Sequence, residues 1–224
     1  MNDYYVTTLA AERLRKVYDI APPRVRQYLH AETNHVAQKI RPGNFILDLG
    51  CGYGRIFPSL ARSAGSVVGI DTSLESILLG QGMFGQIPNC AFAQMNAVRL
   101  GFHDKMFDVV ICIQNGISAF HVHQRDLIRE SFRVTKPGGT ILFSSYCEKF
   151  WEDRLMWFQL QSDAGLLGEI DREKTHNGTI VCKDGFVATT VSPDQFELLT
   201  QGLDADVRVV EVDGSSCFCE IIPR

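Results

Sequence analysis

The stretch FILDLGCGYGRIFPSLA, residues 45–61, places Gly50, Gly52 and Gly54 at alternate positions directly behind a short apolar run. The run at 45–49 is typical of a buried strand, and the apolar pattern that resumes at 55–64 predicts a helix. Glycine permits a tight turn and lets a ligand approach the main chain, while the N-terminus of a helix offers unpaired N–H groups. The strand, the glycine turn and the helix therefore predict a binding loop for a nucleotide-like ligand.

The glycine spacing and two carboxylates separate two classes of ligand. A dinucleotide loop requires G-x-G-x-x-G, whereas this chain has G-x-G-x-G and carries Arg55 where the last required glycine would stand. Asp71, at the end of the next predicted strand (66–71), can accept hydrogen bonds from ribose hydroxyls and suits either NAD or an adenosyl ligand. Asp48 would repel a pyrophosphate but would attract a cationic amino-acid group. The loop therefore favours S-adenosylmethionine over a dinucleotide.

The composition limits the class of protein. The 224 residues contain 22 Lys and Arg against 26 Asp and Glu, and the formal net charge of −4 argues against a dedicated nucleic-acid binder. No apolar run reaches membrane-spanning length, and the N-terminus lacks the apolar segment of a secretory signal. The seven cysteines are scattered and form no C-x-x-C, as in a reduced protein. We therefore expect a cytoplasmic monomer or homodimer with neither nucleic acid nor membrane as a partner.

Strand-like and helical runs alternate through most of the chain, which predicts a parallel sheet covered on both faces. Helices are expected over 8–40 with a break at Pro22-Pro23, after the N-cap Ser73, and over 123–135. The strand-like runs lie at 45–49, 66–71, 90–94, 107–113 and 140–146. The chain ends differently, because runs at 206–212 and 216–222 joined by an Asp213-Gly214 turn predict an antiparallel pair.

Several segments, in this order, resemble the motifs of class I S-adenosylmethionine-dependent methyltransferases. ILDLGCGYGR (46–55) resembles the first motif and VVGIDTS (67–73) the acidic second motif. MNAVRLGFHDKMFDVVIC (95–112) resembles the third and fourth, and ESFRVTKPGGTILFS (130–144) resembles the region that leads into the fifth strand. The resemblance implies an α/β fold with a Rossmann-like, doubly wound, seven-stranded sheet. This sheet is mostly parallel with an antiparallel last strand, and an N-terminal helical lid covers it.

We expect one methyltransferase domain over residues 1–224. Its expected parts are a helical lid (1–40), a cofactor-binding core (41–147), an insert with a hairpin (148–192) and the C-terminal strands (193–224). The signal for the hairpin is Lys-Asp-Gly at 183–185 between two strand-like runs.

The resemblance implies S-adenosylmethionine as the cofactor and S-adenosylhomocysteine as its product. Gly50 and its neighbours should line the methionine and ribose, Asp71 should bind the ribose hydroxyls, and Thr72 should flank the adenine. Asn96 stands where the family often has Asp, and its amide oxygen can accept the same hydrogen bond from the adenine amino group. The residues implied for the cofactor are Asp48, Gly50, Cys51, Gly52, Asp71, Thr72, Asn96, Ala97 and Gln114.

The end of the fourth predicted strand bears on the acceptor. CIQNGISAFH (112–121) lacks the Asn-Pro-Pro-Tyr or Asp-Pro-Pro-Tyr of many enzymes that methylate planar nitrogens, and it is similar to a run of small-amine methyltransferases. The expected function is transfer of a methyl group to N, O or S of a small-molecule acceptor by an in-line reaction. The alternatives are a nucleic-acid or protein methyltransferase, a nicotinamide-dependent oxidoreductase of similar fold, and a protein that binds the cofactor without transfer.

Candidate catalytic bases are His121, His123 and Tyr146, each of which follows a predicted strand, and each is weighed against a structural or solvent-exposed role. His121-x-His123 lacks a third ligand, so no metal is expected. The expected acceptor-binding residues are Tyr5, Asn115, Tyr146 and Trp151. For the aromatic members of this set, packing in the core is the alternative.

Overall fold

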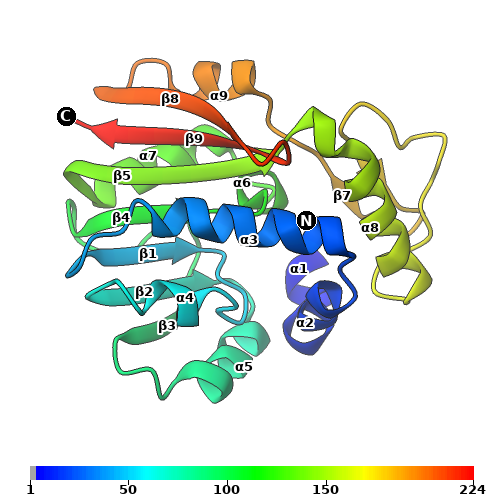
Figure 1. The fold of residues 1–224 in the computed structure, drawn as a ribbon, viewed down its shortest axis with the longest axis horizontal. Coiled ribbons are helices and arrows are strands. Elements are labelled where there is room, and N and C mark those ends of the chain that lie inside the picture. Colours follow the sequence, from blue (N-terminus) through cyan, green and yellow to red (C-terminus); the bar gives the residue numbers. More distant parts are fainter. Residues whose placement is uncertain (1–3) are drawn as a thin grey trace.

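The computed structural model describes residues 4–224, and its centre is a seven-stranded sheet in the order β3-β2-β1-β4-β5-β9-β8 (Figure 1). Neighbouring strands from β3 to β5 pair in parallel, whereas β9 runs antiparallel to both β5 and β8. This topology confirms the expected fold class, including its antiparallel last strand. The strands are β1 (Phe45–Leu49), β2 (Ser66–Asp71), β3 (Cys90–Gln94), β4 (Phe107–Cys112), β5 (Thr135–Tyr146), β8 (Ala205–Val212) and β9 (Ser216–Pro223).

Helices cover both faces of the sheet, as a parallel sheet requires. Successive residues of β1 point to opposite faces, so Ile46 packs in a cluster with Val36 of α3, while Leu47 packs in another cluster with Leu127 of α7. The helices are α1 (Tyr4–Thr7), α2 (Ala11–Asp19), α3 (Pro23–Ala37), α4 (Phe57–Leu60), α5 (Leu74–Phe84), α6 (Gly116–Ala119), α7 (Gln124–Val134), α8 (Trp151–Asp163) and α9 (Pro193–Thr200), with a 3₁₀ turn η1 (Glu148–Phe150) before α8.

A third apolar cluster lies beyond the carboxyl ends of the parallel strands. It joins Leu9 and Val17 of the N-terminal segment to Trp157 and Phe158 of α8. In Figure 1, α1, α2 and α8 stand at the end of the sheet toward which the β1 arrow points. We call α1, α2 and residues 148–192 the cap. The cap therefore lies over the edge of the sheet where ligands bind in open α/β folds.

The N-terminal segment divides into two parts with different positions. The helices α1 and α2 belong to the cap, whereas α3 lies along one face of the sheet and begins at Pro23, a residue suited to the first turn of a helix. The expected lid over residues 1–40 is therefore too long. The segment from Pro23 onward packs against the sheet as part of its helical covering. Residues 1–3 of the expected lid lie outside the described residues.

Two other expectations differ from the structure in detail. The helix expected over 55–64 is reduced to the short α4, which is flanked by turns. The strand β5 begins at Thr135 rather than at 140, because Phe107 pairs with Thr135 before the register shifts and Val109 pairs with Thr140. The Pro-Gly-Gly at 137–139 thus forms an irregularity inside the strand rather than a loop in front of it.

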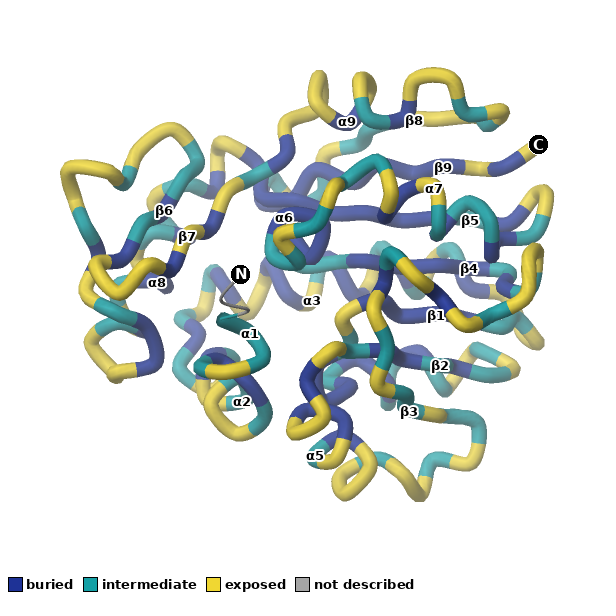
Figure 2. Tube along the Cα trace, turned by 180° about the vertical axis from the view of Figure 1, so that it is seen from behind, coloured by how far each residue is buried: buried dark blue, intermediate teal, exposed yellow. Residues whose placement is uncertain are grey.

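The insert contains the expected hairpin and a helix that the sequence analysis did not predict. The strands β6 (Ile180–Val181) and β7 (Val187–Ala188) pair antiparallel across the turn at 183–185. The helix α8 precedes them and turns one face toward the N-terminal helices. Figure 2 shows that the central strands are largely buried, whereas exposed residues are frequent along the insert.

Residues 4–224 contain no membrane-spanning helix, no disulfide bond and no metal-binding cluster. No helix there is long and apolar enough to cross a membrane. All seven cysteines are free, although the sulfur atoms of Cys147 and Cys217 lie 3.4 Å apart. No cluster of three or more His, Cys, Asp or Glu side chains in this part of the chain could hold a metal ion.

Candidate active site

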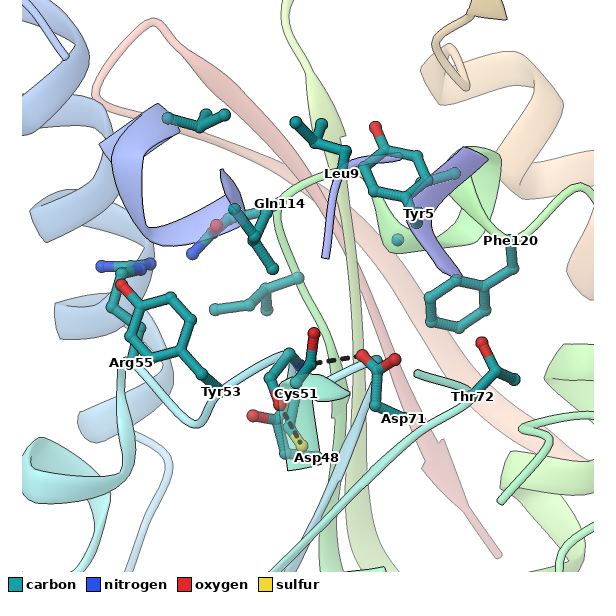
Figure 3. Close-up of a pocket in the computed structure, with 18 of the residues that line it drawn as sticks. Tyr5, Leu9, Asp48, Cys51, Tyr53, Arg55, Asp71, Thr72, Gln114 and Phe120 are labelled. Atoms are coloured by element: carbon teal, nitrogen blue, oxygen red, sulfur yellow. Dashed lines mark hydrogen bonds between the residues drawn. The ribbon is translucent and has the colours of Figure 1, made fainter. Parts of the chain in front are cut away.

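A cavity of about 230 Å³ lies between the cap and the carboxyl ends of the central strands. Residues from β1, β2 and β5 and the two residues that follow β4, Ile113 and Gln114, form its floor, and residues of α1, α2 and α8 form its roof. Figure 3 shows Asp48, Cys51 and Asp71 at the glycine loop. In that view, Arg55 and Tyr53 lie on one side of the cavity and Phe120 and Thr72 on the other.

The glycine loop, residues 50–54, is held open by its backbone conformation. The φ angles of Gly50, Gly52 and Gly54 are +72°, +55° and +76°, and residues with a Cβ rarely adopt this left-handed backbone conformation. A Cβ on Gly50 would lie 2.4 Å from the ring of Phe120, and one on Gly52 would lie 2.9 Å from Leu14. The glycines therefore let Phe120 and Leu14 pack against the main chain of the loop, and a larger residue would displace these side chains.

Asp71 ties the end of β2 to the glycine loop. Its Oδ2 accepts the backbone N–H of Gly52 at 2.9 Å, and its Oδ1 accepts the N–H of Ser73 at 2.8 Å. Ser73 in turn caps α5, because its hydroxyl accepts the N–H of Ser76 at 3.2 Å. The carboxylate is thus fixed in the cavity wall beside Thr72, at the position where the family resemblance expects the ribose hydroxyls.

Asp48 and Arg55 place a buried carboxyl group and a guanidinium group at the floor of the cavity. The side chain of Asp48 is 4% exposed, and burial raises its pKa to about 8, against the opposing effect of nearby Arg55. The guanidinium of Arg55 lies 4.7 Å from the centroid of the Tyr18 ring, and its Nη2 is buried without a hydrogen-bond partner among the described residues. A ligand with both an ammonium and a carboxylate group would satisfy this pair.

Gln114 is held in the cavity by an uncommon backbone geometry. Its φ angle is +54°, and its N–H donates to Ser144 Oγ at 2.8 Å and to Glu32 Oε2 at 3.1 Å. The Tyr18 hydroxyl of α2 donates to Gln114 Oε1 at 2.8 Å. This contact joins the cap to the end of β4 within the cavity.

Asn115 lies outside the cavity lining, in contrast to its expected role at the acceptor. Its amide nitrogen donates to the Thr189 carbonyl at 2.8 Å, and its Oδ1 accepts the Ser145 hydroxyl at 2.7 Å. The same hydroxyl accepts the backbone N–H of Val191 at 2.8 Å. Because its polar atoms bond to β5 and to the end of the insert, Asn115 has a structural position.

At the opposite end from Arg55, Asn96 and Ala97 line the cavity as the resemblance implies. The side chain of Asn96 is exposed, and its Oδ1 already accepts the N–H of Val98 at 3.0 Å. Phe120 and Val122 complete this end. The structure therefore brings together all nine residues expected at the cofactor.

The expected catalytic and acceptor residues divide into two groups. Tyr5 and Tyr146 line the cavity, and burial raises the pKa of Tyr146 above its ordinary value. His121 and His123 are exposed and do not line the cavity. Trp151 is partly buried and does not line the cavity either; its ring centroid lies 5.9 Å from the guanidinium of Arg154.

Sequence reasoning missed several cavity residues. Arg55 was noted only as a break in a glycine pattern, and Tyr18 was not singled out within the helical region expected over 8–40. On α8, Trp157, Phe158 and Gln161 line the cavity. The first two had a signal in the aromatic content of the insert, but Gln161 had none.

Comparisons with known proteins agree with this geometry. Residues 46–139 match the family model described as a methyltransferase domain. The match is confined to that segment, and it agrees with the resemblance to class I S-adenosylmethionine-dependent methyltransferases. The ubiquinone/menaquinone biosynthesis C-methyltransferase UbiE of Ectopseudomonas mendocina is 37% identical over 109 residues, which are 46% of this chain and 42% of that protein. The arsenite methyltransferase of Aquipseudomonas alcaligenes is 29% identical over 147 residues, which are 60% of this chain and 40% of that protein.

The methyltransferase fold extends over the chain. The PH0226 protein of Pyrococcus horikoshii OT3 superposes with a TM-score of 0.67 at 21% identity, over 100% of this chain and 99% of that one. The chain spans less than half the length of the two curated relatives named above. The cofactor of the domain is S-adenosylmethionine, and the cavity fits it. A buried carboxyl, an unpaired guanidinium nitrogen and a glycine cradle stand where its amino-acid part would lie.

Proposed function

We propose that this chain transfers a methyl group from S-adenosylmethionine to a small-molecule acceptor. The observation that carries the proposal is the pair of carboxylates, Asp48 and Asp71, at the ends of neighbouring strands on either side of the glycine loop. Asp48 offers the phosphates of a dinucleotide no positive partner, whereas an adenosyl ligand with an ammonium group suits both carboxyl groups.

Four groups of the chain would hold the cofactor. Asp71 would accept the ribose hydroxyls, Asp48 the ammonium group, and Arg55 the carboxylate through charge-assisted hydrogen bonds. The glycine loop would let the ligand come close to the main chain of the protein. When bound, S-adenosylmethionine supplies a methyl group on a positively charged sulfur, which is a good leaving group.

The cap would contribute by positioning and by excluding water. The rings of Tyr5, Tyr18 and Tyr146 line the cavity and can attract a sulfonium by cation–π interaction. The raised pKa of Tyr146 keeps its hydroxyl protonated near neutral pH, so it can donate a hydrogen bond but is a poor general base. His121 and His123, being exposed, would need a change of loop conformation to reach an acceptor.

A small acceptor is supported by two independent observations. The names of the relatives describe small-molecule substrates, arsenite among them, and the net charge of −4 gives no electrostatic footprint for a polyanion. The expectation of N, O or S as the methylated atom is widened to include carbon, because one relative is a C-methyltransferase. A nucleic-acid or protein acceptor is the alternative.

Cofactor binding and methyl transfer can be tested separately. Calorimetry should show binding of S-adenosylmethionine and S-adenosylhomocysteine but not of NAD; binding of NAD alone would favour the oxidoreductase alternative. The protein is then incubated with methyl-labelled cofactor and either a metabolite extract or total RNA plus protein. Label in small molecules would support the proposal and identify the acceptor by mass. Label confined to the macromolecular arm would contradict it.

A further inference from the structure

The buried face of α8 carries two polar side chains where a helix normally buries apolar ones. Arg154, Trp157, Phe158 and Gln161 follow the i, i+3, i+4, i+7 spacing of one helix face, and all four are buried. Trp157, Phe158 and Gln161 line the cavity together with Leu9, Tyr5 and Tyr146. This set forms the end of the cavity under the cap, which we call the acceptor end.

Gln161 is buried, and its side-chain amide has no hydrogen-bond partner in the part of the chain that the structure describes. Its side chain is 2% exposed, it lines the cavity, and neither amide atom is hydrogen-bonded to any residue from 4 to 224. Gln159, on the outer side of the same helix, bonds instead to Asp163 at 2.8 Å and to Arg172 at 3.0 Å. The amide of Gln161 therefore has the geometry of a group whose partner comes from a ligand.

Arg154 places a positive charge behind the acceptor end. Its side chain is 1% exposed, and its guanidinium lies 4.5 Å from the centroid of the Tyr146 ring and 5.3 Å from that of Phe158. Its Nη atoms donate to the Gly178 and Ala188 carbonyls at 2.7 and 3.1 Å, while Nε has no partner within the described chain.

Among residues 4–224, the groups that face Arg154 include no carboxylate that neutralises it. They are the phenols of Tyr5, Tyr28 and Tyr146. The nearest acidic influence on Tyr146 is Glu32, whose carboxyl is already bonded by the Ser216 hydroxyl at 3.0 Å and by the Gln114 N–H. The carboxylates that line the cavity, Asp48 and Asp71, belong to the cofactor end. The acceptor end therefore has aromatic walls and one polar group, the Gln161 amide, and the positive charge of Arg154 lies behind it.

We infer that the acceptor end binds a planar molecule with an ionisable hydroxyl group, such as a phenol or an enol. Its ring lies against Trp157 and Phe158, and its oxygen receives hydrogen bonds from the Gln161 amide and the Tyr146 hydroxyl. Arg154 does not touch the ligand; it is a positioning residue that acts through the Tyr146 ring and favours the anionic form of the hydroxyl. A cationic amine lacks a carboxylate partner there and is repelled. The inference rests on the proposed function and names its acceptor class.

Binding of matched probes tests the acceptor class without knowledge of the natural acceptor. The probes are para-nitrophenol, nitrobenzene, which lacks the hydroxyl, and para-nitrobenzylamine, which carries a positive charge. Each is titrated calorimetrically into the full chain, with and without saturating S-adenosylhomocysteine. We expect para-nitrophenol to bind at least tenfold more tightly than either analogue, and its phenolate absorption band to increase on binding at a fixed, mildly acidic pH. Equal affinity for the amine or for nitrobenzene would overturn the inference.

Variants connect the preference to the named residues. Gln161→Leu should weaken para-nitrophenol binding about tenfold, the effect of about 1.4 kcal/mol for one hydrogen bond, and leave nitrobenzene affinity unchanged. Gln159→Leu, the same substitution on the outer face of α8, is the matched control and should leave both affinities unchanged. Arg154→Gln should reduce the bound phenolate band, and Arg154→Lys should restore part of it. Tyr146→Phe provides a second test if the Arg154 variants do not fold.

The failure of this inference is distinguishable from failure of the proposed function. If the wild-type chain does not bind S-adenosylhomocysteine, the methyltransferase proposal is contradicted. The probe titrations performed without S-adenosylhomocysteine would still decide which class of ligand the acceptor end binds. Binding of S-adenosylhomocysteine together with an unchanged para-nitrophenol affinity in Gln161→Leu would contradict the inference alone.

Discussion

Two aspartates at the ends of neighbouring strands face the same cavity in different states. The carboxylate of Asp71 is hydrogen-bonded within the protein, because its two oxygens accept the backbone N–H groups of Gly52 and Ser73. Asp48 is 4% exposed and receives no such hydrogen bond from the described residues, and burial raises its pKa to about 8. Donors stabilise the charged form of a carboxylate and burial destabilises it. Asp71 is therefore suited to accept hydrogen bonds as an anion, and Asp48 to become charged when a cation arrives.

The Asp71→Ala substitution should weaken S-adenosylhomocysteine binding by about 2 to 3 kcal/mol, the scale for hydrogen bonds to a charged acceptor. It removes the ribose contact and also releases the Gly52 N–H. Calorimetry measures the change. Asp126→Ala, at an exposed position on α7, is the matched control and should bind like wild type. Unchanged affinity in Asp71→Ala would remove Asp71 from the cofactor site.

The raised pKa of Asp48 predicts a pH dependence with a definite sign. Between its ordinary pKa of 3.8 and about 8 the folded chain holds a proton that the unfolded chain has lost, so Asp48 makes the free energy of unfolding fall as pH rises through this window. An ammonium group of the ligand pairs with the ionised form, so S-adenosylhomocysteine affinity should rise over the same window and level off above about pH 8.

Asp48→Asn should remove both effects. Thermal unfolding with and without S-adenosylhomocysteine, from about pH 5 to about pH 9, measures them as the difference between variant and wild type. This difference is needed because Glu32, whose pKa burial raises to about 7, contributes with the same sign, and His35, whose pKa burial lowers, contributes with the opposite sign. Parallel profiles for Asp48→Asn and wild type would mean that Asp48 does not titrate in this window.

Among the elements, α2 and α8 are joined to each other and to the site by specific contacts. Trp157 Nε1 donates to the Val17 carbonyl at 3.1 Å, and the Tyr18 hydroxyl donates to Gln114 at 2.8 Å. Arg13 adds bonds to the Gly165 and Leu166 carbonyls at 2.7 and 3.1 Å. The N-terminal helices thus close the cavity by binding the insert on one side and the end of β4 on the other.

Removal of residues 1–20 should leave the sheet folded and reduce turnover more than stability, because water would enter the cavity. Circular dichroism and thermal unfolding report the fold, and methyl-label transfer reports turnover. Tyr18→Phe is the milder variant: it loses the Gln114 contact and should cost about 1 kcal/mol of stability. A truncated chain with full activity would mean that these helices only pack.

The difference between α8 and the central strands shows what local sequence patterns can predict. β1 and β4 are short apolar runs, and their type and position were predictable to within a residue or two. The helix α8 was missed because its buried face includes Arg154 and Gln161, so its apolar residues do not follow a single stripe. Asn115 was assigned to the acceptor on its place after β4, yet its side chain turns to β5 and Thr189. Such directions depend on partners distant in sequence, which periodicity does not encode.

At the scale of the whole molecule, the fold divides into a framework and a cap. The two sheet clusters, one on each face, contain the central strands and make up the framework. The third cluster joins segments far apart in sequence, Leu9 and Val17 with Trp157 and Phe158, and makes up the cap. The cavity lies between the two bodies, so its cofactor half follows from local motifs, whereas its acceptor half follows from the packing of the cap.

This division predicts how hydrogen exchange responds to the product cofactor. The amides of β1, β4 and β5 are buried in paired strands, where exchange requires global unfolding, so S-adenosylhomocysteine should slow them only through the gain in overall stability. The amides of α2, α8 and the loop at 113–121 border the cavity, and they should gain protection beyond that amount because the ligand contacts both bodies. Mass spectrometry of exchanged peptides can separate these regions, and Asp71→Ala should abolish the extra protection. If the extra protection from exchange is limited to the amides of the glycine loop and β2, the cap is equally closed without the ligand. Entry of the acceptor would then require an opening of the cap that the cofactor does not control.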